Sequence, residues 1–489
     1  MGVRNRISSL FRGPDEFDLT TGDIGKPLFF LSMPIVVTNL FQTAYNLADT
    51  FWLGQYSTDA LAAISFAFPM VFLLISLGMG ISVAGSVLVA QFTGADEERE
   101  AEYAASQTVT FAVIVSILLG VVGYFGVETF LSLLGASQDV LPMATGYMEV
   151  ISLGLLFMFG FFVFVALMRG YGDTITPMLV MFGSVVLNII IDPFLIFGWT
   201  VVENAPLVGT LSFPELGIQG AAIATVFSRA LALLVGLAIM FRGNRGVQIH
   251  LREMIPDLSY LRRLVRIGLP ASIEGTGRAL SMNLLLVIVA LFPDTVVAAY
   301  GIGTRVFSVI FLPAIAVARG VETMTGQNMG ANKPDRAERA AGLAAKVLFG
   351  VLTVAGILVW VTAAPIADLF TTNPDVVEIT TQFIRYVALT FGFIGIMRAY
   401  TGSFRGAGKT LTAAAISVLM LGVIRFPIAW VAAGPLGELG IWLSFSISNV
   451  AGATIAYVWY QRGAWQETTL TESRLNLSKT ATEASADGD

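Results

Sequence analysis

The amino-acid sequence predicts an all-α polytopic membrane protein. We expect 12 transmembrane helices in two six-helix lobes, related by a pseudo-two-fold axis along the membrane normal. The 489-residue chain is 55% hydrophobic and only 13% charged, whereas soluble proteins carry about 25% charged residues. Its charges lie between apolar stretches close to the ~20 residues that cross a bilayer. The two halves of the chain also resemble each other.

Twelve stretches are long and apolar enough to be spans. We expect them at approximately 27–53, 60–84, 100–125, 142–168, 174–198, 217–241, 262–291, 296–320, 336–362, 377–402, 410–432 and 437–461. The segment 1–26 contains no apolar run and no small-residue cleavage site, so we expect no signal peptide there. The acidic end TATEASADGD is typical of a disordered tail.

Lysine and arginine residues predict the orientation in the cell membrane. One set of predicted loops is basic, and Arg405 belongs to it, whereas the alternate set contains neither Lys nor Arg. By the positive-inside rule, both termini are cytoplasmic. The predicted parts are a cytoplasmic N-terminal segment (1–26), an N-lobe (27–241), a cytoplasmic linker (242–261), a C-lobe (262–461) and a cytoplasmic tail (462–489).

A constant shift along the chain, which brings residue 33 onto residue 269, aligns the two halves. AQFTGADEEREAEYAA then matches GQNMGANKPDRAERAA, and LMRGYGDTIT matches SFRGAGKTLT. Each half holds an even number of spans, so the repeats run in the same direction. Transporters with this plan place substrate between the halves and rock them for alternating access. A duplicated channel or receptor is the alternative.

Several kinds of chemistry are excluded or disfavoured. The chain has no cysteine and one histidine, His250, which excludes disulfide, thiolate and Cys/His zinc chemistry. GSFRGAGKT resembles a phosphate-binding loop, but Ser403 replaces its first glycine, and the repeat carries Asp173 in place of Lys409. We interpret both stretches as cytoplasmic turns. We therefore expect no nucleotide, no enzyme activity, and no cofactor beyond a coupling ion.

The composition also hints at the source. The net charge is −6, and cysteine is absent. An acidic, cysteine-free chain suits a high-salt cytoplasm, which favours a prokaryotic and halophilic archaeal origin.

Polar side chains recur along the first span. Asn39, Gln42, Asn46 and Asp49 share one helical face, which must meet protein or water rather than lipid. For Asn39 and Asn46, hydrogen bonding between helices is the favoured interpretation. For Asp49 we favour a functional role.

The fifth span carries a second acidic residue. Asn188 and Asp192 are four residues apart and share a face, and Pro193 removes a backbone donor beside them. By distance from the outer helix ends, Asp49, Asp192 and Thr225 lie at similar depths. Their oxygen atoms suit a hard cation such as Na⁺. Alternatively, the two carboxylates share a proton.

The second half has no acidic residue at the matching positions. Its buried charges include Glu274 and Arg278, whose spacing predicts an intrahelical ion pair, and Arg425. Arg398, and Arg229 in the first half, are expected to extend from helix ends toward water.

The order of these motifs resembles the multidrug and toxic compound extrusion (MATE) family. The resemblance rests on PIVVTNLFQTAYNLADTFWLG in the first span, the R-G-x-G-x-T turns, and NIIIDP followed by GIQGAAIAT. It covers roughly 27–461 and is greatest to the archaeal and DinF-like branch. The family exports organic, often cationic and amphipathic compounds by antiport with H⁺ or Na⁺.

The resemblance implies roles for residues of the first half. The implied proton or Na⁺ coupling set is Asp49, Asn188, Asp192 and Thr225. The implied substrate-cavity set is Gln42, Tyr45, Asn46 and Met181. Pro34 and Pro193 are the implied helix bends.

We therefore predict a monomeric secondary antiporter for small organic compounds, working in the lipid bilayer without nucleic acid. One alternative is a flippase for lipid-linked oligosaccharides, which would use basic residues such as Arg278, Arg398 and Arg425. Another is an ion channel or a sensor that transports nothing.

Overall fold

The computed structural model describes residues 18–133, 138, 140–198, 200–205, 209–212 and 214–466. The predicted N-terminal segment is thus described only from residue 18. The acidic end of the chain, predicted to be a disordered tail, lies outside the described residues. The chain divides into two compact units. Unit 1 holds Pro34–Ser86 and Arg99–Ser272, and unit 2 holds 18–33, Val87–Glu98 and 273–466.

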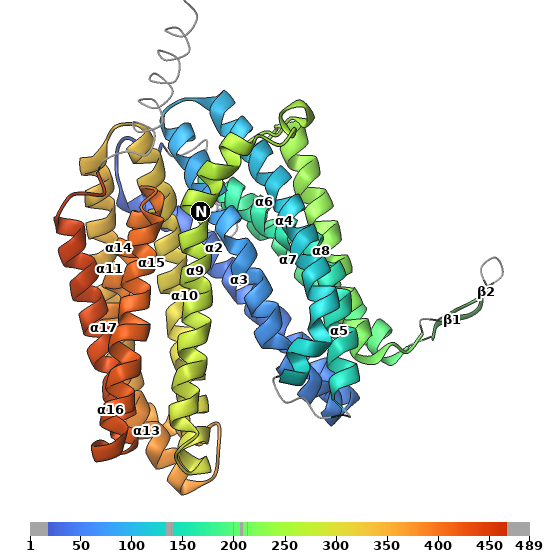
Figure 1. Ribbon diagram of the computed structural model, residues 1–489, viewed down its shortest axis with the longest axis vertical. Helices are drawn as coiled ribbons and strands as arrows, with labels where there is room; N and C mark the ends of the chain where they lie inside the picture. The colour runs from blue at the N-terminus through green and yellow to red at the C-terminus, as the bar shows by residue number, and fades with distance from the viewer. Residues whose placement is uncertain are drawn as a thin grey trace, which may run out of the picture. The chain divides into compact units, whose positions relative to one another are not determined.

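Unit 1 is built around the helices of the first half (Figure 1). They are α2 (Gly25–Tyr56), α3 (Thr58–Gly94), α4 (Glu98–Leu133), α5 (Leu141–Leu153), α6 (Leu155–Tyr171), α7 (Ile175–Phe197) and α8 (Gly217–Arg242), followed by the 3₁₀ helix η2 (Leu251–Glu253). The start of α2, the end of α3 and the first residue of α4 belong to unit 2. Within unit 1, α8 packs against α5, α6 and α7.

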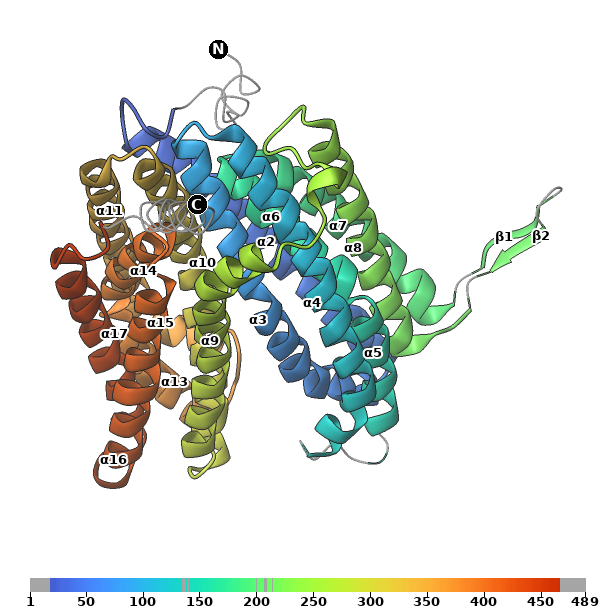
Figure 2. The same ribbon diagram turned by 45° about the horizontal axis from the view of Figure 1, so that its top comes forward.

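Unit 2 contains the helices of the second half, seen from a second direction in Figure 2. They are α9 (Leu258–Val289), α10 (Asp294–Gly330), α11 (Pro334–Val361), α12 (Ala363–Asp368), α13 (Pro374–Ala388), α14 (Phe391–Gly406), α15 (Thr410–Val418), the π-helix η3 (Leu419–Arg425), α16 (Phe426–Leu436) and α17 (Glu438–Gln461). α14 packs against α10, α11 and α17, so its side chains are largely enclosed. The first residues of α9, up to Ser272, belong to unit 1.

The prediction of an all-α fold with 12 spans is confirmed. Among the described residues, ten helical stretches are each long and apolar enough to cross a membrane, and one of them, Thr410–Leu436, consists of α15, η3 and α16. The pairs α5–α6 and α13–α14 each form one further span, bent by 54° and 49°. The sequence predicted each pair as a single span, at 142–168 and 377–402.

The helix boundaries confirm the internal repeat. α3 begins at Thr58 and ends at Gly94, whereas α10 begins at Asp294 and ends at Gly330. The shift that brings residue 33 onto residue 269 therefore carries both ends of α3 onto those of α10. The bend between α5 and α6 falls at Gly154, and the bend between α13 and α14 falls at Leu389 and Thr390. The same shift carries one bend onto the other.

Two local features differ from the prediction. The loop after α7 contains an antiparallel hairpin of β1 (Thr200–Ala205) and β2 (Gly209–Ser212), which extends away from the ends of α7 and α8 in Figure 1. The sequence predicted no strand there. In addition, α14 continues to Gly406, so Arg405 is a buried helical residue rather than part of a cytoplasmic turn.

The predicted linker is fastened to α4. The side chain of Gln107 donates a hydrogen bond to the backbone oxygen of Glu253 at 2.5 Å. Asp257 accepts hydrogen bonds from the backbone nitrogen of Ser259 at 2.8 Å and from the Tyr103 hydroxyl at 2.9 Å. Asp257 thereby caps the first turn of α9. Hydrogen bonding, mainly from the Ser259 side chain, lowers the pKa of Asp257.

We expect Asp257→Ala to lower the free energy of unfolding by about 1 kcal/mol at neutral pH, because the helix loses its cap. Since the folded state lowers the pKa of this carboxyl, its charge stabilises the fold above about pH 4, and this contribution is lost as the pH falls through the folded-state pKa. Thermal unfolding of purified wild type and variant at pH 7 and pH 3 measures this. Asp368→Ala, an exposed aspartate at the end of α12, is the control. A difference between Asp257→Ala and wild type that does not shrink at pH 3 contradicts the charge argument.

Glycines bring α14 close to α10. A Cβ atom at Gly402 would meet the carbonyl oxygen of Ala318, and one at Gly406 would meet that of Glu322. The four-residue spacing is that of small-residue contacts between membrane helices. This close packing sets the position of α14 along the axis of α10.

Gly402→Ala should lower the free energy of unfolding by about 1–3 kcal/mol, because the added methyl group overpacks the α10–α14 contact. Gly350→Ala in α11 is the matched control, because a Cβ atom there meets nothing within 4 Å. The control should be neutral or stabilising by up to about 1 kcal/mol. Thermal unfolding of the two purified variants compares them, and equal stability would show that the close approach is not needed.

Candidate ion-coupling site

The structure brings the two acidic residues of the first half together inside unit 1. Asp49 on α2 is 5% exposed, and Asn188 and Asp192 on α7 are fully buried. The carboxyl groups of Asp49 and Asp192 lie close enough to interact directly. Asn188 Nδ2 donates to Asp192 Oδ1 at 3.1 Å. Helix depth, judged from sequence, also placed these two carboxyls at the same level.

A shared hydrogen bond between two carboxyl groups requires a proton. An ionised carboxylate only accepts hydrogen bonds, whereas a protonated carboxyl also donates one. One proton held between Asp49 and Asp192 leaves the two residues with one negative charge in total. We call these two residues the carboxyl pair.

Thr225 is connected to the carboxyl pair through Tyr45. The Tyr45 hydroxyl donates to Thr225 Oγ1 at 2.5 Å, and it lies close to Asp49. Both residues are buried. Tyr45, implied as cavity lining by the resemblance, thus lies beside the carboxyl pair, and Thr225 does not contact the carboxyls directly in any interaction among the described residues.

Arg229 on α8 is a part of the site that sequence reasoning missed. It lies in the middle of α8 and is only 2% exposed, so the prediction that it extends from a helix end toward water is wrong. It donates to Gln42 Oε1 at 2.8 Å and contacts Met181 Sδ at 2.9 Å. Its guanidinium lies over the rings of Tyr45 and Phe161, 5.0 and 5.1 Å from their centroids.

Arg229 balances the charge of the carboxyl pair. It acts electrostatically on Asp49 across the Tyr45 ring. With one proton on the carboxyl pair, the three ionisable side chains sum to zero charge. Loss of that proton leaves a net charge of −1 in a buried site, which favours uptake of a cation.

The residues proposed to line a substrate cavity are placed differently from one another. Gln42 Nε2 donates to Asn46 Oδ1 at 3.1 Å, and Asn46 is exposed. Tyr45 and Met181 are buried. Gln42 and Asn46 are therefore at least partly exposed, whereas Met181 is buried against Arg229.

Both predicted helix-bending prolines lie inside continuous helices. α2 runs through Pro34 and α7 runs through Pro193. Pro193 thus withdraws a backbone donor beside Asp192 without ending the helix. A bend at either position stays a prediction.

Three buried oxygen atoms of the site have no hydrogen-bond donor. They are Asp49 Oδ1, Asp192 Oδ2 and Asn188 Oδ1. Such orphaned acceptors are rare in folded proteins, and carboxylate and amide oxygens are the ligands that hard cations prefer. No cluster of three or more His, Cys, Asp or Glu side chains suited to a metal occurs in the described part of the chain. The site thus offers two carboxylates and an amide, which fit a proton or a monovalent cation.

The second unit has a different polar interior. The predicted ion pair is confirmed, with Arg278 Nη2 3.2 Å from Glu274 Oε1. Arg425 is buried, donates to Ser448 Oγ at 2.8 Å and Asn449 Oδ1 at 2.9 Å, and lies 4.2 Å from the centroid of the Phe445 ring. Neither arrangement reproduces the carboxyl pair of unit 1.

Ionisable side chains buried inside membrane spans are characteristic of transport proteins. Together with the repeated bundle, they define the chain as a polytopic membrane transporter. The MatE family model matches residues 34–194 and 270–431, one match in each half. The chain belongs to the MatE family of multidrug efflux transporters, as the resemblance implied.

Individual relatives cover nearly the whole chain. Probable multidrug resistance protein YpnP of Bacillus subtilis is 28% identical over 451 residues, which cover 92% of this chain and 98% of the relative. An FAD transporter of Shewanella oneidensis is 28% identical over 448 residues, 92% of this chain and 97% of the relative. A crystal structure of a variant of the Vibrio cholerae MATE transporter VcmN matches the fold with a TM-score of 0.83 at 23% identity, covering 91% of this chain and 98% of that chain.

Arg229→Gln should lower the free energy of unfolding by about 1.5–3 kcal/mol, since it removes charged hydrogen bonds from a buried site. Arg242→Gln, at the exposed end of the same helix, should change it by less than about 0.5 kcal/mol. Thermal unfolding of both purified variants measures the difference. Equal melting temperatures would refute the structural role of Arg229.

Proposed function

We propose that the protein is a secondary antiporter that exports amphipathic, often cationic organic compounds in exchange for H⁺ or Na⁺. The supporting observation is the carboxyl pair: Asp49 and Asp192 lie close together in a buried site that has three unpartnered oxygen atoms. A structural role alone would satisfy those acceptors with donors.

The charge balance supports a coupling mechanism. The site is neutral when the carboxyl pair holds one proton and Arg229 is charged. Release of the proton leaves a charge of −1, and either a proton or Na⁺ restores neutrality, with Asn188 and the two carboxylates supplying oxygen ligands. Because a buried net charge is costly, the ion-free form is poised to take up a cation. Rocking of the two lobes then exchanges that cation for substrate.

The coupling set in this proposal is Asp49, Asn188, Asp192 and Thr225, with Tyr45 and Arg229 holding them in place. The relatives named multidrug resistance or multidrug export proteins support an efflux role. The one named an FAD transporter extends the substrates that we consider beyond cationic drugs. We further propose that the protein is a monomer in a prokaryotic, halophilic archaeal cell membrane, with lobes 27–241 and 262–461 and both termini cytoplasmic.

Asp49→Asn and Asp192→Asn should reduce gradient-driven dye efflux from proteoliposomes to the level of protein-free liposomes, because the carboxyl pair can no longer exchange a cation. Efflux of a cationic dye is measured with a Na⁺ gradient alone and with a pH gradient alone, which also identifies the ion. Glu149→Gln is the matched control, because it removes another half-buried acid of unit 1, on α5. Undiminished efflux by both aspartate variants would reject the coupling assignment.

A flippase for lipid-linked oligosaccharides is the second candidate. The observation that favours it is the concentration of buried arginines in unit 2, including Arg398, Arg405 and Arg425. A lipid-scrambling assay in the same proteoliposomes separates the two functions. Ion-independent transfer of lipid-linked sugar together with no dye exchange would favour the flippase.

A further inference from the structure

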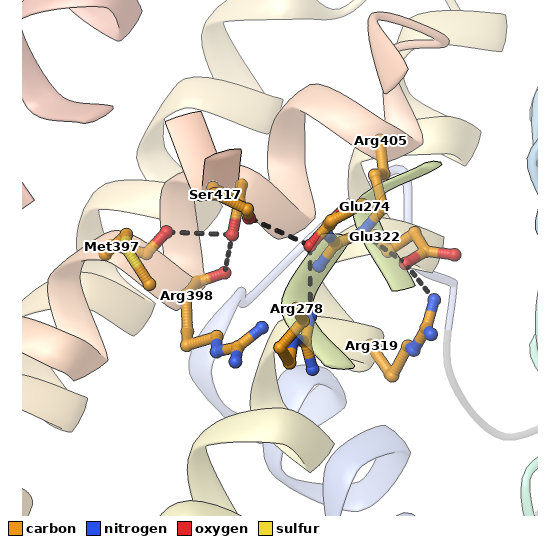
Figure 3. Close-up of polar contacts among 9 residues, drawn as sticks. Glu274, Arg278, Arg319, Glu322, Met397, Arg398, Arg405 and Ser417 are labelled. Carbon is orange, nitrogen blue, oxygen red and sulfur yellow. Dashed lines mark hydrogen bonds and ion pairs between the residues drawn. The ribbon is translucent and has the colours of Figure 1, made fainter. Parts of the chain in front are cut away.

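Six charged side chains gather inside unit 2, outside the site described above. They come from α9, α10 and α14 (Figure 3). The close contacts at Gly402 and Gly406 hold α14 against α10. We call them the arginine cluster, which consists of Glu274, Arg278, Arg319, Glu322, Arg398 and Arg405. Four cations and two anions give the cluster a formal charge of +2.

Two carboxylates hold three of the arginines. Arg405 lies between them, with Nη1 3.1 Å from Glu274 Oε2 and Nε 3.3 Å from Glu322 Oε2. Glu274 also pairs with Arg278 at 3.2 Å. Glu322 also pairs with Arg319 at 2.8 Å. Each carboxylate is therefore already shared by two guanidinium groups.

Arg398 has no such partner. It is 9% exposed, and its Nε is buried without a hydrogen-bond acceptor. No ion pair of Arg398 occurs within the described part of the chain, and its guanidinium lies over the Phe311 ring at 5.7 Å. The prediction that it extends from a helix end toward water is wrong, because it lies in the middle of α14.

The guanidinium of Arg398 is directed toward that of Arg278 in Figure 3. Two like charges in a low-dielectric interior repel each other. Arg278 and Arg319 keep 29% and 21% of their side chains exposed, so the cluster is open to a ligand. An anion between Arg398 and Arg278 would supply the missing acceptor and remove the repulsion.

We propose that Arg398 and Arg278 bind the anionic group, a carboxylate or a phosphate, of an amphipathic compound. Guanidinium groups match the geometry of both anions through paired hydrogen bonds. Glu274 and Glu322 hold Arg405 and thereby orient the neighbouring arginines, so they are positioning residues. The transport of such compounds rests on the proposed export function, whereas their binding does not.

Binding of fluorescein, an amphipathic dye with a carboxylate, tests the proposal. Anisotropy is measured with the full-length protein in nanodiscs of zwitterionic phosphatidylcholine. Arg398→Gln should weaken binding by about tenfold or more, as expected for loss of a charged hydrogen bond, and Arg398→Lys should weaken it less. Arg385→Gln is the matched control, because Arg385 lies on α13 over the Trp360 ring, 5.4 Å from its centroid, outside the cluster.

Unchanged fluorescein affinity in folded Arg398→Gln would overturn the proposal and leave the cluster as a structural ion-pair network. If Arg398→Gln does not fold, Arg278→Gln decides by the same criterion, since its side chain is partly exposed. Addition of phosphatidylglycerol to the nanodiscs distinguishes the source of the anion. Displacement of the dye by this lipid indicates that the site binds a lipid phosphate, and no displacement indicates that it binds a free solute. In both cases the affinity must fall in Arg398→Gln.

The two proposals fail separately. Asp192→Asn should bind fluorescein with wild-type affinity, since Asp192 belongs to unit 1 and the arginine cluster to unit 2. Loss of fluorescein binding in Asp192→Asn would contradict an independent anion site. Normal binding together with normal gradient-driven efflux by that variant would refute only the coupling assignment.

Discussion

The cost of placing charge in a low-dielectric interior is the constraint on which the rest of this structure depends. Backbone groups in the bilayer are satisfied within helices, and ionisable side chains there need a partner, a proton or a function. Unit 1 meets the requirement with Asp49, Asp192 and Arg229, whose charges sum to zero when the two carboxyls hold one proton. Unit 2 meets it with ion pairs among the described residues, none of which includes Arg398. The buried charged groups of unit 1 therefore sum to zero or −1, whereas the arginine cluster of unit 2 sums to +2.

The repeat separates scaffold from function. The shift that aligns the two halves carries both ends of α3 onto those of α10, so the helices and their bends are common to both halves. The charges are not: the carboxyl pair occurs in unit 1 alone, and the arginine cluster in unit 2 alone. A duplicated bundle therefore folds with either set. The charged residues are best explained by what each half binds.

Much of the fold and part of the site could be predicted from sequence. Apolar length and the repeat predict the spans, and helix depth pairs Asp49 with Asp192. The position of a residue along a helix does not show which helical face its side chain lies on. The sequence therefore predicts that Arg229 extends toward water, whereas in the structure its guanidinium lies over the Tyr45 ring. The break at Leu389 and Thr390 has no glycine or proline to signal it, because tertiary packing of α13 and α14 sets it. The hairpin of β1 and β2 was not predicted either, because the length of apolar stretches identifies membrane spans and not short strands in a loop.

The charges of the carboxyl pair in unit 1 and of the arginine cluster in unit 2 determine which ionic groups each unit can bind. The carboxyl pair with Arg229 is neutral when it holds its proton and gains a negative charge without it, so its affinity for a cation depends on its protonation. The arginine cluster has no such switch, because arginine stays charged at all physiological pH values. A compound with an anionic group would then be held by a constant field in unit 2. The variable charge of unit 1 would decide when a cation, whether coupling ion or drug, is released.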